Sequence, residues 1–447
     1  MAFRTAGRPR LPVRVRAALR WLLIGLAGTG AVALVAWLTF PVWSGFGAWT
    51  ALPAGPAPAH QVLLDPRFAQ AGDSALALLA AHRREHGFPA LTGAVSVDGS
   101  VVWVGATGWA DLESGTPAGP ETVFRIGSTS KAVTATALAR LLDRGRIALD
   151  TPLARFRGDW PNARWGKLTP RQLGSHTAGL PGYEDNRDAG GLFMTVCGCR
   201  RYDTVWESLR LFDGARLRYE PGTDFHYSSF DVNLLGALLA EVEGRPFLEV
   251  LDSLVFDPLG LAQAGAENDG RDGSRLATFY ESEGGRARAW RPFDLSQRLP
   301  GGGLVATSRE LARLGGAWLD TTFIALATRE ALWTPQRLAS GEVNPQRYAI
   351  GWRFYAAVER PGHPGDTISY AHHGGVSKGA MSWLVVYPES RVAVAVNLNT
   401  RAETFPTFAA VERRISALFL DRAEALSAAE SPVEPPHTPS APRTPAR

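Results

Sequence analysis

The stretch FRIGSTSKAVTATAL, Phe124–Leu138, decides the fold, because it places Ser128 three residues before Lys131. Lysine occurs only three times among the 47 basic residues, so its use here in place of arginine needs a reason. The sequence TSKAVTATALARLLDRG has helical spacing, and Gly145 suits the position just after a helix C-terminus. We therefore expect Ser128 at the N-terminal end of a helix that closes at Gly145.

The spacing of Ser128 and Lys131 predicts nucleophilic chemistry. Side chains three residues apart share a helix face, so the lysine amine can reach the serine hydroxyl. A neutral amine accepts the serine proton, whereas a guanidinium stays protonated, and burial or a neighbouring cation lowers the pKa of lysine. Free N–H groups at the helix N-terminus would stabilise an oxyanion. A Ser-x-x-Lys tetrapeptide also arises by chance, so further motifs must support this interpretation.

An uncharged run, WLLIGLAGTGAVALVAWLTFPVW at 21–43, follows six arginines in the first 20 residues. Roughly 20 apolar residues suffice to cross a bilayer, and flanking arginines predict a cytoplasmic N-terminus. The alternative is a cleaved signal peptide, but the cleavage candidate Ala57–Ala59 lies well beyond the apolar run. We expect a single-pass membrane protein with its main part outside the cytoplasm, on the periplasmic side if the protein is bacterial.

Composition indicates a globular protein, with 45% hydrophobic and 20% charged residues in 447. The net charge of +4 gathers at the N-terminus, so nucleic-acid binding is not expected. The expected segments are a basic N-terminus (1–20), a transmembrane anchor (21–43), a linker (44–71), one large catalytic domain (72–426) and a disordered proline-rich tail (427–447).

Periodicity along the chain predicts sheet at both ends and helices between. The expected elements are a helix at 72–87, a hairpin turning at Asp98-Gly99, a mainly helical part at 129–270, a second hairpin at 380–399 and a helix at 405–423. This arrangement is typical of an α+β fold with a helical insertion.

Three segments carry a family resemblance, and Ser-x-x-Lys is the signature of penicillin-binding proteins and serine β-lactamases. These are GSTSKAVTATALARLLDRGRIALDTPL, LTPRQLGSHTAGLPGY and EPGTDFHYSSFDVNLLGALLAEVEG. The chain thereby resembles the class C β-lactamase-like serine hydrolases over roughly residues 73–425. The resemblance implies a β-lactamase/penicillin-binding-protein-like α+β fold, with an antiparallel sheet flanked by helices and a helical subdomain inserted. ESLRLF and RLPGGGLVAT are most similar to the mitochondrial β-lactamase-like serine peptidases, which are membrane-associated and can self-assemble.

The resemblance assigns catalytic roles by position. Ser128 would be the nucleophile, Lys131 its proton partner, and Tyr227 the tyrosine that shares general acid/base duty. Tyr227 and Lys131 would titrate as a coupled pair, and which of them holds the proton stays open. Without the surrounding PG-x-x-F-x-Y-S pattern, Tyr227 would be interpreted as an ordinary core aromatic.

Two departures from the family pattern concern substrate binding. The family's asparagine two residues after the tyrosine is Ser229 here, which removes a carboxamide. The Lys-Thr-Gly motif of β-lactamases is His372-His373-Gly374, and an unshifted histidine is largely neutral at pH 7. We therefore expect Ser229, His372 and Gly374 to contact substrate and β-lactam turnover to be poor.

The strand that follows would complete the oxyanion site. The resemblance implies that the amide of Gly375 is the second oxyanion donor, together with the amide of Ser128. We expect His373 to point away from the site, because neighbouring residues on a strand face opposite sides.

Several other patterns are better explained without chemistry. GVSKG, 375–379, matches a nucleophile elbow, but a strand follows it where a helix is required, so Ser377 and Lys378 are expected in a loop. His363, His372 and His373 lack the spacing of metal ligands, and no cofactor or metal is expected. His176 is interpreted as structural, hydrogen-bonding backbone near the cleft.

The glycines at 301–303 follow no βαβ pattern and are interpreted as a tight turn at the cleft floor. Cys197 and Cys199 flank one residue. A disulfide between them would be strained, so a local redox clip and two unpaired thiols both remain open.

These observations favour an exported, membrane-anchored serine hydrolase that acts through a Ser128 acyl-enzyme. Its substrates would be small peptides, esters or amides. The alternative is a non-catalytic β-lactam-sensing or scaffolding protein with the same fold. A homo-oligomer is suggested by the family analogy alone.

Overall fold

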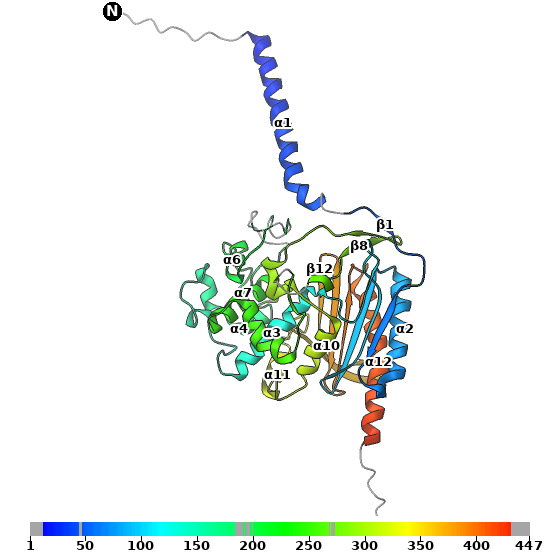
Figure 1. Ribbon diagram of the computed structural model, residues 1–447. Helices are drawn as coiled ribbons and strands as arrows, with labels where there is room; N and C mark the ends of the chain where they lie inside the picture. The colour runs from blue at the N-terminus through cyan, green and yellow to red at the C-terminus, as the bar shows by residue number, and fades with distance from the viewer. Residues whose placement is uncertain are drawn as a thin grey trace, which may run out of the picture.

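The computed structural model describes residues 12–43, 47–183, 191, 193, 197–198, 200–267, 269 and 273–430. Strands lie at both ends of the main folded part, and most helices come between them in the chain (Figure 1). The predicted α+β layout is therefore confirmed.

One antiparallel sheet forms the centre of the molecule. In spatial order its strands are β11 (Arg353–Arg360), β12 (His363–Ser377), β13 (Ala380–Tyr387), β14 (Val392–Leu398), β3 (Ala90–Val97), β4 (Ser100–Asp111) and β2 (Ala59–Leu63), and β5 (Thr116–Pro117) also pairs with β4. Both predicted hairpins are present, and the turn between β3 and β4 has positive φ at Asp98 (51°) and Gly99 (78°). Pairing of β14 with β3 joins the two ends of the chain in one sheet.

Two long helices cover one face of this sheet. They are α2 (Ala69–His86), preceded by the short η1 (Pro66–Phe68), and α12 (Phe405–Glu430), which lie side by side (Figure 1). The core beneath them is aromatic: Phe419 stacks on Phe68 at 5.8 Å between ring centroids and lies 5.7 Å from Trp103. Helix α2 ends at Gly87 with φ of 62°, the left-handed conformation that commonly ends helices.

Helix α12 also corrects one boundary. The proline-rich tail was predicted to begin at residue 427, but α12 continues to Glu430. Residues 427–430 have an alanine-rich sequence that favours helix, and proline follows only at position 432. The rest of the predicted tail lies outside the described residues.

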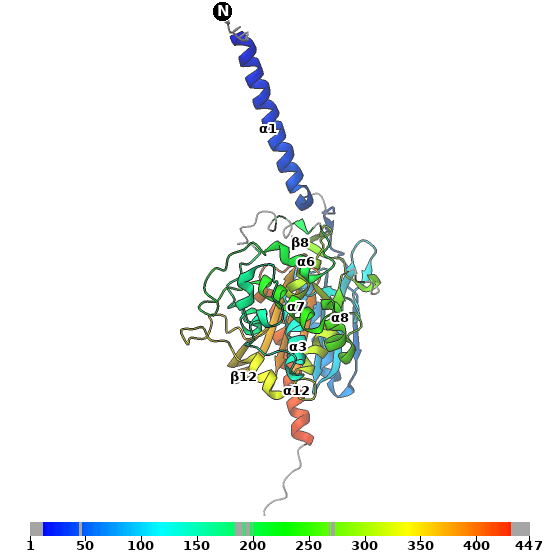
Figure 2. The same ribbon diagram turned by 90° about the vertical axis from the view of Figure 1, so that its left-hand side faces the viewer.

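The opposite face of the sheet carries α10 (Ser308–Ala317) and the helical insertion (Figure 2). At its centre lie α3 (Ser130–Asp143) and α7 (Ser229–Glu243). The shorter helices are α4 (Pro170–Gly174), α6 (Val205–Ser208), α8 (Phe247–Leu251), α9 (Asp257–Leu259) and α11 (Leu326–Trp333). Every residue of α3 from Ser130 to Ala139 is buried, so this helix is core on all sides and can hold a side chain away from water.

Short strands tie the insertion and the N-terminal segment to the rest. β6 (Phe124–Arg125) pairs with β10 (Leu304–Ala306), which also pairs with β7 (Gly265–Ala266). In a second small sheet, β9 (Arg286–Ala289) lies between β1 (Thr50–Ala51) and β8 (Tyr280–Glu283). The β6–β10 pair brings the start of α3 next to the glycines at 301–303.

The N-terminal helix α1 (Val13–Trp43) projects from the rest of the protein (Figures 1 and 2). Its segment Arg14–Thr39 is the one helix among the described residues that is long and apolar enough to cross a membrane, and none of it is buried. A cleavable signal sequence has the same length and composition.

Replacing Phe419 by alanine should lower the free energy of unfolding by about 3–5 kcal/mol, because it empties a buried aromatic site between α12 and the sheet. Urea unfolding followed by fluorescence measures this change. Arg414→Ala, on an exposed position of the same helix, should stay within ~0.5 kcal/mol of the wild type. Equal losses in both variants would show that the Phe419 contacts contribute nothing specific.

Candidate active site

Ser128 lies in η2 (Gly127–Thr129), a single turn that leads directly into α3. Gly127 has a φ of 51°, and a Cβ on it would lie 2.7 Å from backbone atoms of Val376 on β12. The turn is fixed from within, since Ser130 Oγ donates to the Gly127 carbonyl at 2.7 Å and accepts from the Leu304 amide at 3.1 Å. Glycine at 127 therefore lets the serine turn lie against the edge of the sheet.

Lys131 is fully buried, and its Nζ atom has three oxygen neighbours. Ser128 Oγ is at 3.1 Å, Ser229 Oγ at 2.9 Å, and the carbonyl oxygen of Gly301 is a third, close partner. A neutral amine donates two hydrogen bonds and accepts one, so this arrangement lets Lys131 accept the hydroxyl proton of Ser128. The predicted contact between the side chains of Ser128 and Lys131 is therefore present.

The pKa of Lys131 lies well below its ordinary value, chiefly because the amine is buried. The cationic side chains of Arg353 and Arg298 lower it further, whereas Asp231 opposes the shift. Both effects that sequence reasoning invoked, burial and a neighbouring cation, are present. Both effects favour the neutral form of the amine, which is the form that can act as a base.

Tyr227 completes the group around Ser128. The Ser128 side chain lies near enough to lower the pKa of the tyrosine, and Lys131 Nζ lies 4.9 Å from its ring centroid. Burial has the larger effect and raises the pKa of Tyr227, although Ser128 and Arg353 act in the opposite direction. These shifts favour a protonated tyrosine beside a neutral lysine, and hence Lys131 as the base and Tyr227 as the acid of the coupled pair.

The edge of β12 lies directly against the serine turn. A Cβ on Gly375 would lie 1.8 Å from the carbonyl oxygen of Ile126 and 2.9 Å from the amide nitrogen of Thr129, so only glycine fits. Thr129 Oγ1 contacts the carbonyl of His373 at 3.4 Å, which shows that this residue's backbone groups face η2. Alternate residues present their backbone to the same edge, so the amide of Gly375 faces the same way. The arrangement favours Gly375 as an oxyanion donor.

The two histidines of β12 lie on opposite faces, as strand alternation predicts, but their directions are the reverse of those expected. The His373 ring is hydrogen-bonded at 2.8 Å to the hydroxyl of Tyr348, whose ring packs against Tyr227. The His372 ring instead packs against Trp383 at 4.4 Å, on the face covered by α12. The structure therefore does not bring the His372 side chain to Ser128.

Two further residues predicted to bind substrate occupy distinct positions. A Cβ on Gly374 would lie 2.4 Å from Phe405 and 2.8 Å from Trp383, so this residue faces α12 and allows close packing there. Ser229 is nearly buried at the start of α7 and contacts Lys131. Its hydroxyl therefore supports the amine, and the carboxamide of the family pattern is absent.

A buried carboxylic acid, Asp231, was missed by sequence reasoning. Its Oδ2 atom lies 3.3 Å from Nδ1 of His176, and both side chains are fully buried. Burial raises the pKa of Asp231 and lowers that of His176, and so favours the neutral form of both. The available signal was an acidic residue inside the otherwise apolar helix sequence SFDVNLLGALL.

His176 has the structural surroundings that its sequence context suggested. Its Nδ1 lies 3.3 Å from the Ser228 amide, and its carbonyl accepts hydrogen bonds from the Tyr219 hydroxyl and the His226 amide. Its ring packs against the rings of Tyr227 and Tyr348, with ring centroids 4.4 and 4.5 Å apart. This packing helps to fix the position of the Tyr227 ring.

The remaining sequence patterns also have a place. Ser377 ends β12, and the turn at Lys378-Gly379 leads into strand β13, so the elbow is excluded as predicted. The glycines at 301–303 form a tight segment whose first carbonyl contacts Lys131. Cys197 is buried and disulfide-bonded, whereas Cys199 lies outside the described residues.

The rate of Ser128 acylation by a fluorophosphonate should rise with pH and level off well below 10.5, the ordinary lysine value, because the neutral form of Lys131 is the base. Stopped-flow or gel-based labelling at a series of pH values measures this. Lys131→Arg should lose at least ~100-fold in rate, since the guanidinium stays protonated. A wild-type rate that keeps rising to pH 10 would exclude a lysine with a lowered pKa.

Comparison with known protein families shows a match to the family described as beta-lactamase over residues 75–418. Among individual proteins, the chain is 27% identical over 416 residues to the mitochondrial serine beta-lactamase-like protein LACTB of Bos taurus, covering 74% of each. It is 34% identical over 187 residues to esterase EstB of Burkholderia gladioli, covering 39% of this chain and 47% of the esterase.

Solved structures have the same fold. The D-amino acid amidase of Ochrobactrum anthropi SV3 matches with a TM-score of 0.62 and 22% identity, covering 81% of this chain and 100% of the amidase. A penicillin-binding protein from Bacillus halodurans matches with a TM-score of 0.60 and 23% identity, covering 75% and 98%. The antiparallel sheet with a helical insertion is thus the β-lactamase/penicillin-binding-protein fold.

Proposed function

Because the chain belongs to the β-lactamase family, we propose that it is an exported, membrane-anchored serine hydrolase that forms an acyl-enzyme at Ser128. The observation that carries the proposal is the 3.1 Å contact between the Ser128 hydroxyl and the buried amine of Lys131. Since burial keeps that amine neutral, the contact joins a nucleophile to its base.

In the first half-reaction, Ser128 Oγ bonds to the substrate carbonyl carbon while its proton passes to Lys131 Nζ. The carbonyl oxygen becomes an oxyanion between the amides of Ser128 and Gly375. The bond to the leaving group then breaks, and Tyr227 supplies the leaving group's proton while recovering one from the Lys131 ammonium. This leaves an acylated serine and a neutral lysine.

In the second half-reaction, water attacks the carbonyl carbon of the acyl group on Ser128 and gives a proton to Lys131. The second tetrahedral intermediate collapses, the carboxylic acid leaves, and Ser128 regains its proton. Each step uses side chains and amides that lie around Ser128 and Lys131. Two-step hydrolysis of a small peptide, ester or amide therefore follows from the proposed roles.

The relatives support a carboxyl-group substrate without naming it. EstB is described as an esterase, and among the structural neighbours are a D-amino acid amidase and a D-alanine carboxypeptidase. The helix α1 supports anchoring, with the catalytic domain outside the cytoplasm. Self-association of the chain is part of the proposal and rests on the family analogy alone.

Arg353 is a cation near the site, but it does not stand where the family has the lysine of its Lys-Thr-Gly motif. Its guanidinium carbon lies 5.5 Å from the Tyr227 ring centroid and 4.9 Å from that of Tyr348. It projects from β11 rather than from β12, so it does not reproduce the position of a β12 lysine beside the serine. A β-lactam carboxylate would therefore lack its usual partner.

The alternative, a non-catalytic β-lactam sensor or scaffold, draws on two observations. The His372 ring is turned away from Ser128, and Ser229 lacks a carboxamide, so two contacts that position family substrates are missing. This alternative predicts stable acylation or none, with biological effects that do not depend on Ser128.

Labelling of the full chain with a fluorophosphonate should fall to background in Ser128→Ala, because Ser229, the other serine in contact with the Lys131 amine, is buried. Ser377→Ala is the matched control, since Ser377 lies in the motif that imitates a nucleophile elbow, and its labelling should equal the wild type. In-gel fluorescence and hydrolysis of a p-nitrophenyl ester measure both. Labelling that persists in Ser128→Ala would move the nucleophile elsewhere.

Turnover of nitrocefin should be at least ~100-fold slower than p-nitrophenyl ester turnover, because no lysine of β12 faces Ser128 to bind the β-lactam carboxylate. Absorbance assays of both substrates with the same preparation measure this ratio. Rapid nitrocefin hydrolysis that disappears in Ser128→Ala would refute the expected selectivity.

A further inference from the structure

The last turn of α2, residues 82–86, has the sequence HRREH. Positions three and four apart share one face of a helix, so His82, Glu85 and His86 project together. Two histidines four residues apart on a helix, with a glutamate between them, are a recurring source of metal ligands. The catalytic group around Ser128 makes no use of these side chains.

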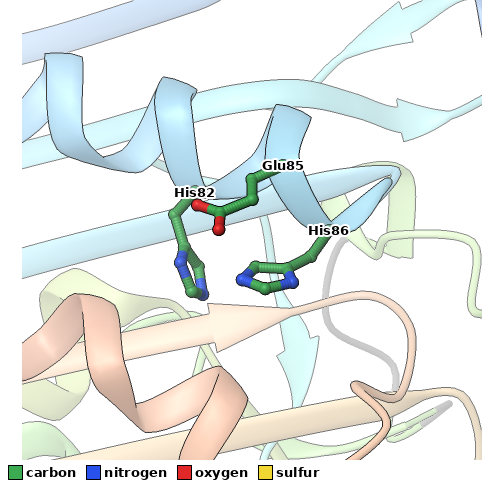
Figure 3. A group of neighbouring side chains, drawn as sticks. All are labelled: His82, Glu85 and His86. Atoms are coloured by element: carbon green, nitrogen blue, oxygen red, sulfur yellow. The ribbon is translucent and has the colours of Figure 1, made fainter.

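The geometry of this cluster suits one ion. One ligand atom from each of the three residues lies within 4.8 Å of the others. Figure 3 shows a ring nitrogen of His82 facing a ring nitrogen of His86, with the Glu85 carboxylate on the same side of the helix. Ligand atoms of a tetrahedral zinc ion are about 3.3 Å apart. Since Glu85 and His86 are exposed, small side-chain rotations close the difference.

His82 provides a second, independent observation. Its side chain is 3% exposed, and its Nε2 atom is buried without a hydrogen-bond partner. The imidazole also interacts with the backbone of Thr407 at the start of α12. Its partnerless Nε2 atom is available to a metal ion.

Charged side chains of both signs lie near the cluster: Arg414 on α12 repels a cation, and Glu85 attracts one. The Arg83 guanidinium is engaged elsewhere, with the carbonyl of Phe88 at 2.9 Å and over the ring of Trp109.

Aromatic packing accounts for only part of the arrangement. The rings of His82 and His86 lie 4.5 Å apart, and both contact Phe88, at 5.8 and 5.5 Å. Such packing would be equally served by phenylalanine or tyrosine. It leaves a buried imidazole nitrogen without a partner, which carries a desolvation cost that a ligand would remove.

We propose that His82 Nε2, His86 and Glu85 bind one divalent ion of the zinc class, with water as the fourth ligand. Two imidazoles and a carboxylate are a donor set that zinc accepts with an open position. The bound ion would fix the last turn of α2 against the start of α12.

The test uses the full chain in detergent, stripped with chelator and titrated with zinc chloride by isothermal calorimetry. We expect one ion per chain, the same in Ser128→Ala, because binding does not depend on hydrolase activity. His86→Ala and Glu85→Gln change exposed side chains and should keep the fold. His86→Ala should weaken zinc binding at least ~100-fold, and Glu85→Gln at least ~10-fold.

The matched control is His363→Ala, since His363 is an exposed histidine that lies 2.7 Å from Asp421, away from α2. The zinc affinity of the His363→Ala variant should equal that of the wild type. Cobalt(II) gives a second readout, as visible absorption bands that His86→Ala abolishes. No stoichiometric binding, or binding that survives in His86→Ala, overturns the proposal, and so does a loss confined to His363→Ala.

Discussion

The burial of one amine is the constraint on which the site depends. Lys131 has no exposed surface, and its Nζ atom has only oxygen neighbours that the fold supplies. A charged ammonium would be costly there, so the surroundings select the neutral form. The small residues of α3 make this burial feasible. A Cβ on Gly351, for example, would lie 2.4 Å from that of Ala135, so the neighbouring chain closes directly over the helix.

Charged and titratable side chains of both signs lie around the buried amine of Lys131. Two arginines, at 298 and 353, lower the pKa of the lysine, and both lie close to aromatic rings. The opposing carboxyl group, Asp231, is itself fully buried and paired with neutral His176. An ionised aspartate here would raise the lysine pKa and favour the ammonium form, which cannot accept a proton. The burial that favours the neutral acid at Asp231 thus also favours the neutral amine at Lys131.

Sequence reasoning placed Ser128 and Lys131 in contact because that contact is local. Ser128 and Lys131 lie one turn apart on a helix whose start and end are marked in the sequence, and both hairpins are marked by turn residues and alternation. The directions of His372 and His373 depend on a different fact, namely which face of β12 is covered by α12. Alternation predicts that the two side chains point to opposite faces of the sheet, but not which of them points toward Ser128. Asp231 was missed because its burial depends on the packing of α7 against the loop at 176–181. The HRREH sequence was readable as a helix face, but only the orphaned nitrogen of His82 makes it notable.

The pairing of β3 with β14 carries a consequence for biogenesis. These neighbours lie roughly 300 residues apart along the chain, so the central sheet cannot be assembled until the last strands have been synthesised. Until then β3 and β4 present an unsatisfied edge and an apolar face to water. Under the proposed export, the incomplete sheet would need protection from aggregation until its last strands arrive. Tethering by an N-terminal helix would keep that vulnerable intermediate dilute and close to the translocation machinery.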